Sequence, residues 1–130
     1  MSEVLRVGVA GLGTVGAETV RLLRLRREDL ERRAGRPIEL VAVSARDRSR
    51  DRGIDLTGVA WEDDAVALAR RGDVDLVCEL IGGSEGPARA LVETALAAGK
   101  SVVTANKALL AHHGTALAKS AEAGGVTLAY

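Results

Sequence analysis

The stretch Val7-Gly8-Val9-Ala10-Gly11-Leu12-Gly13-Thr14-Val15-Gly16 decides the fold of this chain. The apolar run that begins at Val4 and ends at Ala10 is typical of a strand buried on both faces of a parallel sheet. Three glycines follow with the spacing G-x-G-x-x-G, and beyond them the apolar residues recur with a helical period. A strand, a glycine turn and a helix in this order are the context that the dinucleotide-binding fingerprint requires.

Each glycine of the fingerprint has its own expected task. Gly11 permits the tight turn out of the strand, Gly13 leaves room for a pyrophosphate to approach the backbone, and Gly16 lets the helix pack closely on the sheet. The unpaired N–H groups and the dipole of the first helical turn then face the phosphates. The alternative is a purely structural turn, because glycine is abundant in this chain at 15 residues.

Composition limits the classes of protein that remain. A length of 130 residues predicts one domain, and 47% hydrophobic residues are enough for a core. Aromatic residues are only 2%, so Val, Leu, Ile and Ala must fill that core. Lys plus Arg and Asp plus Glu are equal at 18 each, and a net charge of zero argues against a nucleic-acid partner.

Three features of the sequence indicate the cellular compartment of the protein. Cys78, the only cysteine, lies in an apolar run, and we interpret it as a small core residue of a reducing compartment. No apolar stretch reaches the ~20 residues of a membrane span. Glu3 and Arg6 stand where a secretory leader would be apolar. We therefore expect a cytoplasmic protein without a membrane partner.

Turn residues and apolar periods divide the rest of the chain into alternating helices and strands. Together they predict one α/β domain over residues 1–130, with a Rossmann-type doubly wound parallel sheet of about six strands and helices on both faces. The expected helices and strands in chain order are a helix over 14–34, a strand over 38–43, a short strand over 59–61, a helix capped by Asp63 or Asp64, a strand over 74–81, a helix over 87–99, a strand over 101–103, a helical region interrupted at Gly114 that ends at Gly124, and a strand from 126.

Candidate binding residues follow the expected strands, where a doubly wound sheet has its crevice. Arg46 comes after the second strand, where a basic residue favours the 2′-phosphate of NADP, whereas Asp47 beside it would favour the NAD ribose hydroxyl. A solvated polar loop is the alternative. Ile81, Gly82 and Gly83 end the fourth strand and are placed to line the crevice, with a purely structural turn as the alternative for the paired glycines. Lys107 follows the fifth strand, and we interpret it as a charge held for a ligand, with a solvated lysine as the alternative. His112 and His113 are adjacent on a helix and cannot share a metal, so we expect no metal site.

The segments VGVAGLGTVG, VAVSARD, VCELIGG and GKSVVTANKALLAHHG resemble the amino-terminal NAD(P)-binding domain of homoserine dehydrogenases. The resemblance covers essentially all 130 residues, and ELIGG and TANKALLA are its most specific parts. In that family a substrate-binding and dimerisation region follows this domain. The resemblance therefore implies a fragment of a homo-oligomeric parent enzyme, with the acid/base residues and a sodium ion located beyond Tyr130.

The resemblance also implies roles for individual residues. Beside the adenosine 2′ position it places Arg46, and next to the nicotinamide and the substrate carbonyl it places Lys107 as a catalytic residue. The cofactor would be NADP or NAD, with NADP favoured. The remaining implied contacts are Gly11, Leu12, Gly13, Thr14, Val15 and Gly16 around the pyrophosphate, and Ile81, Gly82, Thr104, Ala105 and Asn106 on the nicotinamide side.

The family reaction is the interconversion of L-homoserine and L-aspartate 4-semialdehyde with NAD(P)(H) in threonine, methionine and isoleucine biosynthesis. A small-molecule substrate is thus implied for the whole enzyme, and we expect this chain alone to be inactive. Two alternatives stay open. One is a dehydrogenase of the glucose–fructose oxidoreductase type, although its usual E-K-P differs from Asn106-Lys107-Ala108 here. The other is a non-catalytic nucleotide-sensing module.

Overall fold

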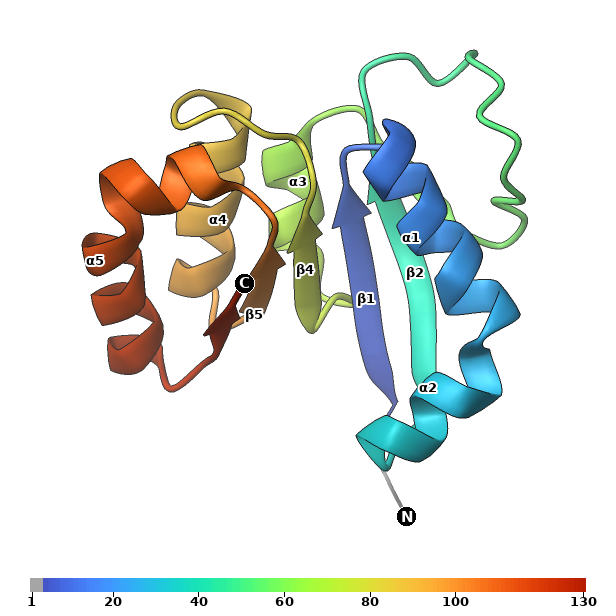
Figure 1. Ribbon diagram of the computed structural model, residues 1–130, viewed down its shortest axis with the longest axis horizontal. Coiled ribbons are helices and arrows are strands. Elements are labelled where there is room, and N and C mark those ends of the chain that lie inside the picture. The colour runs from blue at the N-terminus through green and yellow to red at the C-terminus, as the bar shows by residue number, and fades with distance from the viewer. Residues whose placement is uncertain (1–3) are drawn as a thin grey trace.

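A single parallel sheet forms the centre of the molecule in the computed structural model, which describes residues 4–130 (Figure 1). Glu3, one of the two residues that argue against a secretory leader, lies outside the described residues. The sheet has six strands in the order β3-β2-β1-β4-β5-β6, which confirms the predicted Rossmann-type α/β fold. The strands are β1 Leu5–Ala10, β2 Ile38–Ser44, β3 Ala60–Glu62, β4 Leu76–Glu79, β5 Ser101–Thr104 and β6 Leu128–Ala129.

The strand order reverses between β1 and β4, and the carboxyl ends of the strands are in register there. Ala10 pairs with Ser44 of β2 on one side and with Glu79 of β4 on the other, and Glu79 pairs with Thr104 of β5. Figure 1 shows the arrowheads of β1, β2 and β4 at the same edge of the sheet. Ligands of doubly wound sheets bind outside this edge, at the point of reversal.

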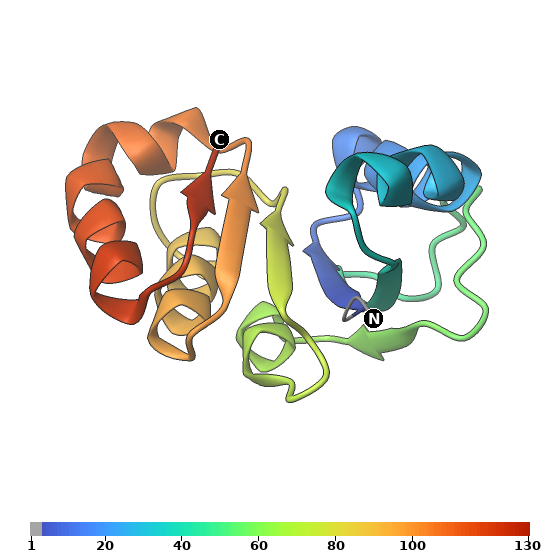
Figure 2. The same ribbon diagram turned by 90° about the horizontal axis from the view of Figure 1, so that it is seen from below.

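Helices cover both faces, as predicted. On one face α1 (Thr14–Leu25) packs over β1 and β2 through a cluster that contains Val9, Val20 and Val43. The opposite face carries α3 (Ala65–Arg70), α4 (Pro87–Ala97) and α5 (Lys107–Gly124) over a larger cluster. Figure 2 shows α1 and α2 (Arg27–Ala34) on one side of the sheet, with α3 and α4 on the other. No helix among residues 4–130 has the length and apolar character needed to cross a membrane.

Two predicted helix boundaries are wrong. The helix expected over 14–34 breaks at Arg26, whose φ of −106° and ψ of 23° are not helical. The second piece, α2, buries no residue and is held by surface ion pairs such as Arg27–Glu31, so nothing in the core keeps it in line with α1. In α5 the helix continues through Gly114, because packing on α4 outweighs the modest helix cost of one glycine.

Cys78 lies where the sequence predicted, in the core. Its side chain packs against the cluster under α1. Burial raises the pKa of its thiol to about 11, so the thiol stays protonated at neutral pH. A structural role for Cys78 follows, rather than a reactive one.

An ion pair at the amino edge of the sheet ties β1 to the turn before β4. The Arg6 guanidinium donates to both carboxylate oxygens of Asp75, from Nε at 3.1 Å and Nη2 at 3.0 Å. The Arg6 backbone N–H also donates to Asp75, at 3.0 Å. The pKa of Asp75 is lowered, chiefly by the hydrogen bond from the Arg6 side chain. The pair therefore stabilises the folded state only while Asp75 is ionised.

Asp75→Asn is expected to lower the melting temperature at neutral pH and to matter much less in acid. The folded-state pKa lies below the unfolded value of about 3.9, so the stabilisation is present above that pH and is lost as pH falls through the folded pKa. Thermal unfolding of both proteins at neutral pH and at about pH 3 measures this difference in melting temperature. The exposed Glu28→Gln is the control, and an Asp75→Asn deficit equal at both pH values would contradict the prediction.

Candidate functional site

A cleft of about 490 Å³ opens at the carboxyl edge of the sheet, at the point where the strand order reverses between β1 and β4. Its walls come from the glycine turn after β1, the end of β2, the start of α3 and the turn between β4 and α4. The lining residues are Gly11, Leu12, Gly13, Ser44, Ala45, Arg46, Arg50, Arg52, Asp63, Asp64, Ala65, Leu80, Ile81 and Pro87. Residues from distant parts of the sequence thus meet at the predicted crevice.

The fold itself requires glycine at positions 11 and 16. Gly11 has a φ of 95°, which side chains rarely adopt, and a Cβ there would lie 2.5 Å from the Leu80 carbonyl oxygen. Its N–H donates to the Ser44 carbonyl at 2.8 Å, which holds the turn against β2. A Cβ on Gly16 would overlap the carbonyl oxygen of Gly11. The helix can therefore start this close to the strand only because both positions lack side chains.

Gly13 has a different environment. A Cβ added to it would have no atom within 4 Å, so the fold itself leaves the space beside Gly13 open. Gly13 is also the N-cap of α1 and offers no side chain to the first-turn N–H groups, and the first turn carries no acid. These N–H groups and the positive end of the helix dipole face that open space, which is the environment that a phosphate needs.

The side chains around Gly13 point in different directions. Leu12 is buried in the cluster under α1, although it also borders the cleft. Thr14 and Val15 are exposed at the start of α1. A phosphate at this turn would therefore contact mainly backbone N–H groups, and Thr14 would add the only hydroxyl of the turn.

Arg46 is exposed and lines the cleft directly after β2. Asp47, its acidic neighbour, is not part of the lining. The carboxylate of Asp47 accepts hydrogen bonds from the N–H of Ser49 at 3.1 Å and from its hydroxyl at 2.7 Å, and these bonds lower its pKa. The acid that would compete with Arg46 is thus engaged within its own loop.

Arg50 and Arg52 also line the cleft, and sequence reasoning missed both. Arg48, between Arg46 and Arg50, lines a neighbouring pocket and not the cleft. The residues between β2 and β3 form a long irregular excursion beside α1 (Figure 1). Its alternation of Arg with Asp and Ser was a signal for charge, but without periodicity the sequence could not show which arginines return to the cleft.

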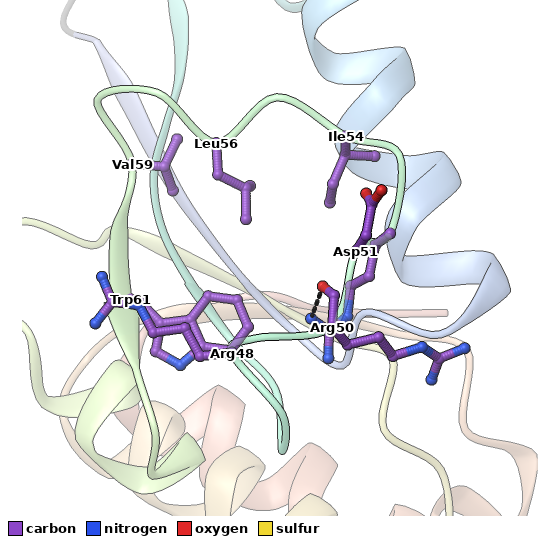
Figure 3. A pocket seen from close by; sticks show the side chains of 8 residues that line it. Arg48, Arg50, Asp51, Ile54, Leu56, Val59 and Trp61 are labelled. Atoms are coloured by element: carbon purple, nitrogen blue, oxygen red, sulfur yellow. Dashed lines mark hydrogen bonds between the residues drawn. The ribbon is translucent and has the colours of Figure 1, made fainter.

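The neighbouring pocket, about 210 Å³, lies under this excursion, and apolar side chains of the excursion line it. Figure 3 shows Ile54, Leu56 and Val59 pointing from the loop toward the pocket, with the Trp61 ring at its side. The Arg52 guanidinium lies 5.4 Å from the centre of the Trp61 ring. Trp61 is therefore a packing residue at the sheet edge, and its ring also contacts the Arg52 guanidinium.

Two acids at the start of α3 complete the part of the cleft that contains Arg46. Asp64 is the N-cap of α3, and its carboxylate accepts the Val66 N–H at 3.0 Å. Asp63 accepts the indole N–H of Trp61 at 2.8 Å. The sequence predicted one of them as a cap, but it did not anticipate that both line the cleft.

The turns after β4 and β5 are joined by a hydrogen bond between Asn106 and Gly83, but among the predicted residues of these two turns only Ile81 lines the cleft. Ile81 lines the cleft, and Gly82 follows it with a φ of 91° and open space beside it. Thr104 and Asn106 are buried, and their side chains bond to other parts of the protein, while Ala105 between them is exposed. Lys107 is the exposed first residue of α5 and does not belong to the cleft lining.

Among residues 4–130, no group of three or more His, Cys, Asp or Glu side chains is placed to hold a metal ion. His113 instead pairs through its Nε2 with Glu85 of the turn before α4, and this contact lowers the pKa of Glu85. The contact joins the β4–α4 turn to α5.

Comparison with known proteins points to one family. A family model for the NAD-binding domain of homoserine dehydrogenase matches residues 11–130. Homoserine dehydrogenase of Corynebacterium glutamicum is 50% identical over an alignment 127 residues long, which covers 94% of this chain and 27% of that protein. A crystal structure of homoserine dehydrogenase from Thiobacillus denitrificans has a TM-score of 0.90 at 40% identity, covering 99% of this chain and 30% of that one. Biliverdin reductase of Synechocystis, solved with biliverdin and NADP⁺, has a TM-score of 0.74 at 25% identity, covering 95% of this chain and 37% of that one.

Proposed function

This chain belongs to the homoserine dehydrogenase family, in which it corresponds to the NAD-binding domain, and we propose that its cleft binds NADP(H) in preference to NAD(H). The observation that carries the binding proposal is the open space at Gly13, bounded by the uncapped start of α1. A purely structural turn requires glycine at positions 11 and 16, but it has no such requirement at position 13.

The preference for NADP(H) rests on the charges in the adenosine half of the cleft. Arg46, Arg50 and Arg52 line it, and the carboxylate of Asp47 is held by Ser49. A 2′-phosphate carries roughly −1.5 to −2 charges at neutral pH, and a guanidinium can bind it with two parallel hydrogen bonds. Asp63 and Asp64 lie in the same half and could accept hydrogen bonds from hydroxyl or amino groups of the adenosine.

Arg46→Ala is expected to remove most of the preference for NADPH. Since the site is open to solvent, we expect wild type to bind NADPH about tenfold more tightly than NADH. Titration calorimetry with both nucleotides measures the ratio, and Arg48→Ala is the matched control because Arg48 lies outside the cleft lining. Equal affinities for NADPH and NADH in wild type, unchanged by Arg46→Ala, would contradict the prediction.

For the whole enzyme we propose the reaction that gives the family its name, between L-homoserine and L-aspartate 4-semialdehyde. The chain spans 27% of its Corynebacterium relative, so it represents the nucleotide-binding part of that activity. When bound, the nicotinamide supplies or accepts the hydride, and the residues of this chain bind and orient it. Lys107 would place a positive charge next to the substrate carbonyl and polarise it.

Two further expectations remain proposals. A homo-oligomeric parent enzyme follows from the family resemblance, and a cytoplasmic location agrees with a single cysteine, Cys78, that forms no disulfide. The glucose–fructose oxidoreductase type of dehydrogenase is not favoured, because the family model and the closely similar relatives are homoserine dehydrogenases.

A further inference from the structure

Glu79, the last residue of β4, is a fully buried carboxylate to which the proposed function assigns no role. Its Oε2 accepts hydrogen bonds from the backbone N–H groups of Ile81 at 2.8 Å and Gly82 at 3.0 Å. Its Oε1 accepts the hydroxyl of Thr104 at 2.7 Å. Burying a carboxylate is costly unless it is hydrogen-bonded, and these three donors meet that requirement.

The network continues from Thr104 into the next turn. The Thr104 hydroxyl accepts the N–H of Asn106 at 3.0 Å, and the Asn106 side-chain amide donates to the Gly83 carbonyl at 2.6 Å. The side-chain Oδ1 of Asn106 caps α5 by accepting the Leu109 N–H at 3.0 Å. The β4–α4 turn and the β5–α5 turn are therefore joined at two points, and Glu79 is the centre of the network.

The β4–α4 turn needs this support. Gly82 and Gly83 follow one another with φ values of 91° and 88°, and two consecutive glycines leave a turn with many alternative conformations. Both N–H groups that Glu79 binds belong to this turn. The carboxylate therefore holds the backbone at Ile81, which lines the cleft. The same carboxylate fixes Thr104, from which Ala105 and Lys107 follow.

We propose that Glu79 is a positioning residue for the nicotinamide half of the bound dinucleotide. It holds the Ile81–Gly82 turn and the Thr104–Asn106 turn in one arrangement, so that both present their backbone to the same part of the ligand. The adenosine half depends on Gly13 and Arg46, which lie outside this network. The inference rests on the proposed binding of NADP(H), and it predicts a defect confined to one half of that ligand.

Glu79→Gln tests the inference with a side chain of the same size. The amide oxygen of Gln can still accept the two backbone N–H groups, but its NH2 group then faces the Thr104 hydroxyl, which loses the acceptor for its proton. We expect NADPH to bind at least about fivefold more weakly. Adenosine 2′,5′-bisphosphate, which contains only the adenosine half, should bind within about twofold of wild type. Titration calorimetry measures both ligands, and circular dichroism checks the fold.

Substitutions of Thr104 test the same network without changing a charge. Thr104→Val keeps the shape and removes the hydroxyl, so it should show the same loss for NADPH alone, and Thr104→Ser should lie closer to wild type. This pair decides the question if Glu79→Gln does not fold. Thr115→Val, on the exposed side of α5, is the control.

Two outcomes overturn the inference while leaving the proposed function intact. Either the variants bind NADPH as wild type does, or they lose NADPH and adenosine 2′,5′-bisphosphate to the same extent. Failure of the wild-type chain to bind NADPH overturns the proposed function and this inference with it.

Discussion

Valine in place of Gly13 is expected to weaken NADPH binding by at least about 100-fold while the chain still folds. The Cβ position of Gly13 is open, so the protein itself has room for a side chain there. That room is also where a phosphate must lie to reach the first-turn N–H groups of α1, and a branched side chain fills it. Valine is a poorer N-cap than glycine, so a loss of stability of roughly 1 kcal/mol is expected as well. Titration calorimetry and thermal unfolding measure the two effects separately.

Gly72→Val is the matched control for this change. Gly72 likewise has open space at its Cβ position and no positive φ, but it lies before β4 at the opposite edge of the sheet from the cleft. It should leave NADPH affinity unchanged. If Gly13→Val bound NADPH as tightly as Gly72→Val, the glycine turn would be structural only, and the binding proposal would lose its main support.

The fold could be predicted from the sequence because its signals are local. The glycine spacing after β1, the Gly–Pro start of α4 and the glycines that end α2 and α5 each specify a turn, and the apolar runs between them specify strands. The break at Arg26 was not predictable in this way. The break depends on where the core under α1 ends. The charged residues on both sides of Arg26 are good helix formers, so the sequence itself gives no sign of a break.

The candidate site was predicted only in part, for a related reason. Residues directly after a strand are placed by the strand, so Arg46 and Ile81 could be assigned to the crevice. Arg50 and Arg52 reach it only because Ile54, Leu56 and Val59 fold the excursion back toward the sheet, a tertiary effect. Glu79 did carry a signal, since an acid inside an apolar strand must be satisfied by hydrogen bonds, but its partners Ile81 and Thr104 appear only in three dimensions.

Alanine in place of Gly11 is expected to cost more stability than any other single change considered above. Its φ of 95° requires a conformation that alanine adopts only with strain, and its Cβ would lie 2.5 Å from the Leu80 carbonyl oxygen and 2.8 Å from the Ile81 nitrogen. Backbone strain contributes about 1–3 kcal/mol and overpacking about as much again. The sum of roughly 2–6 kcal/mol is a large part of the 5–15 kcal/mol typical of a domain. Urea unfolding followed by circular dichroism measures the loss.

Gly99→Ala separates the two contributions to this loss. Gly99 has a φ of 76°, but a Cβ there would have no atom within 4 Å, so alanine should cost only the backbone strain. The difference between the two variants is therefore the cost of pushing β1 and β4 apart at the point where the strand order reverses. That displacement would also move Ile81 in the cleft wall, so Gly11→Ala should weaken NADPH binding and Gly99→Ala should not. Equal midpoints for the two variants would mean that the β4–α4 turn yields easily, and that the close approach of Gly11 to Leu80 does not fix the shape of the cleft.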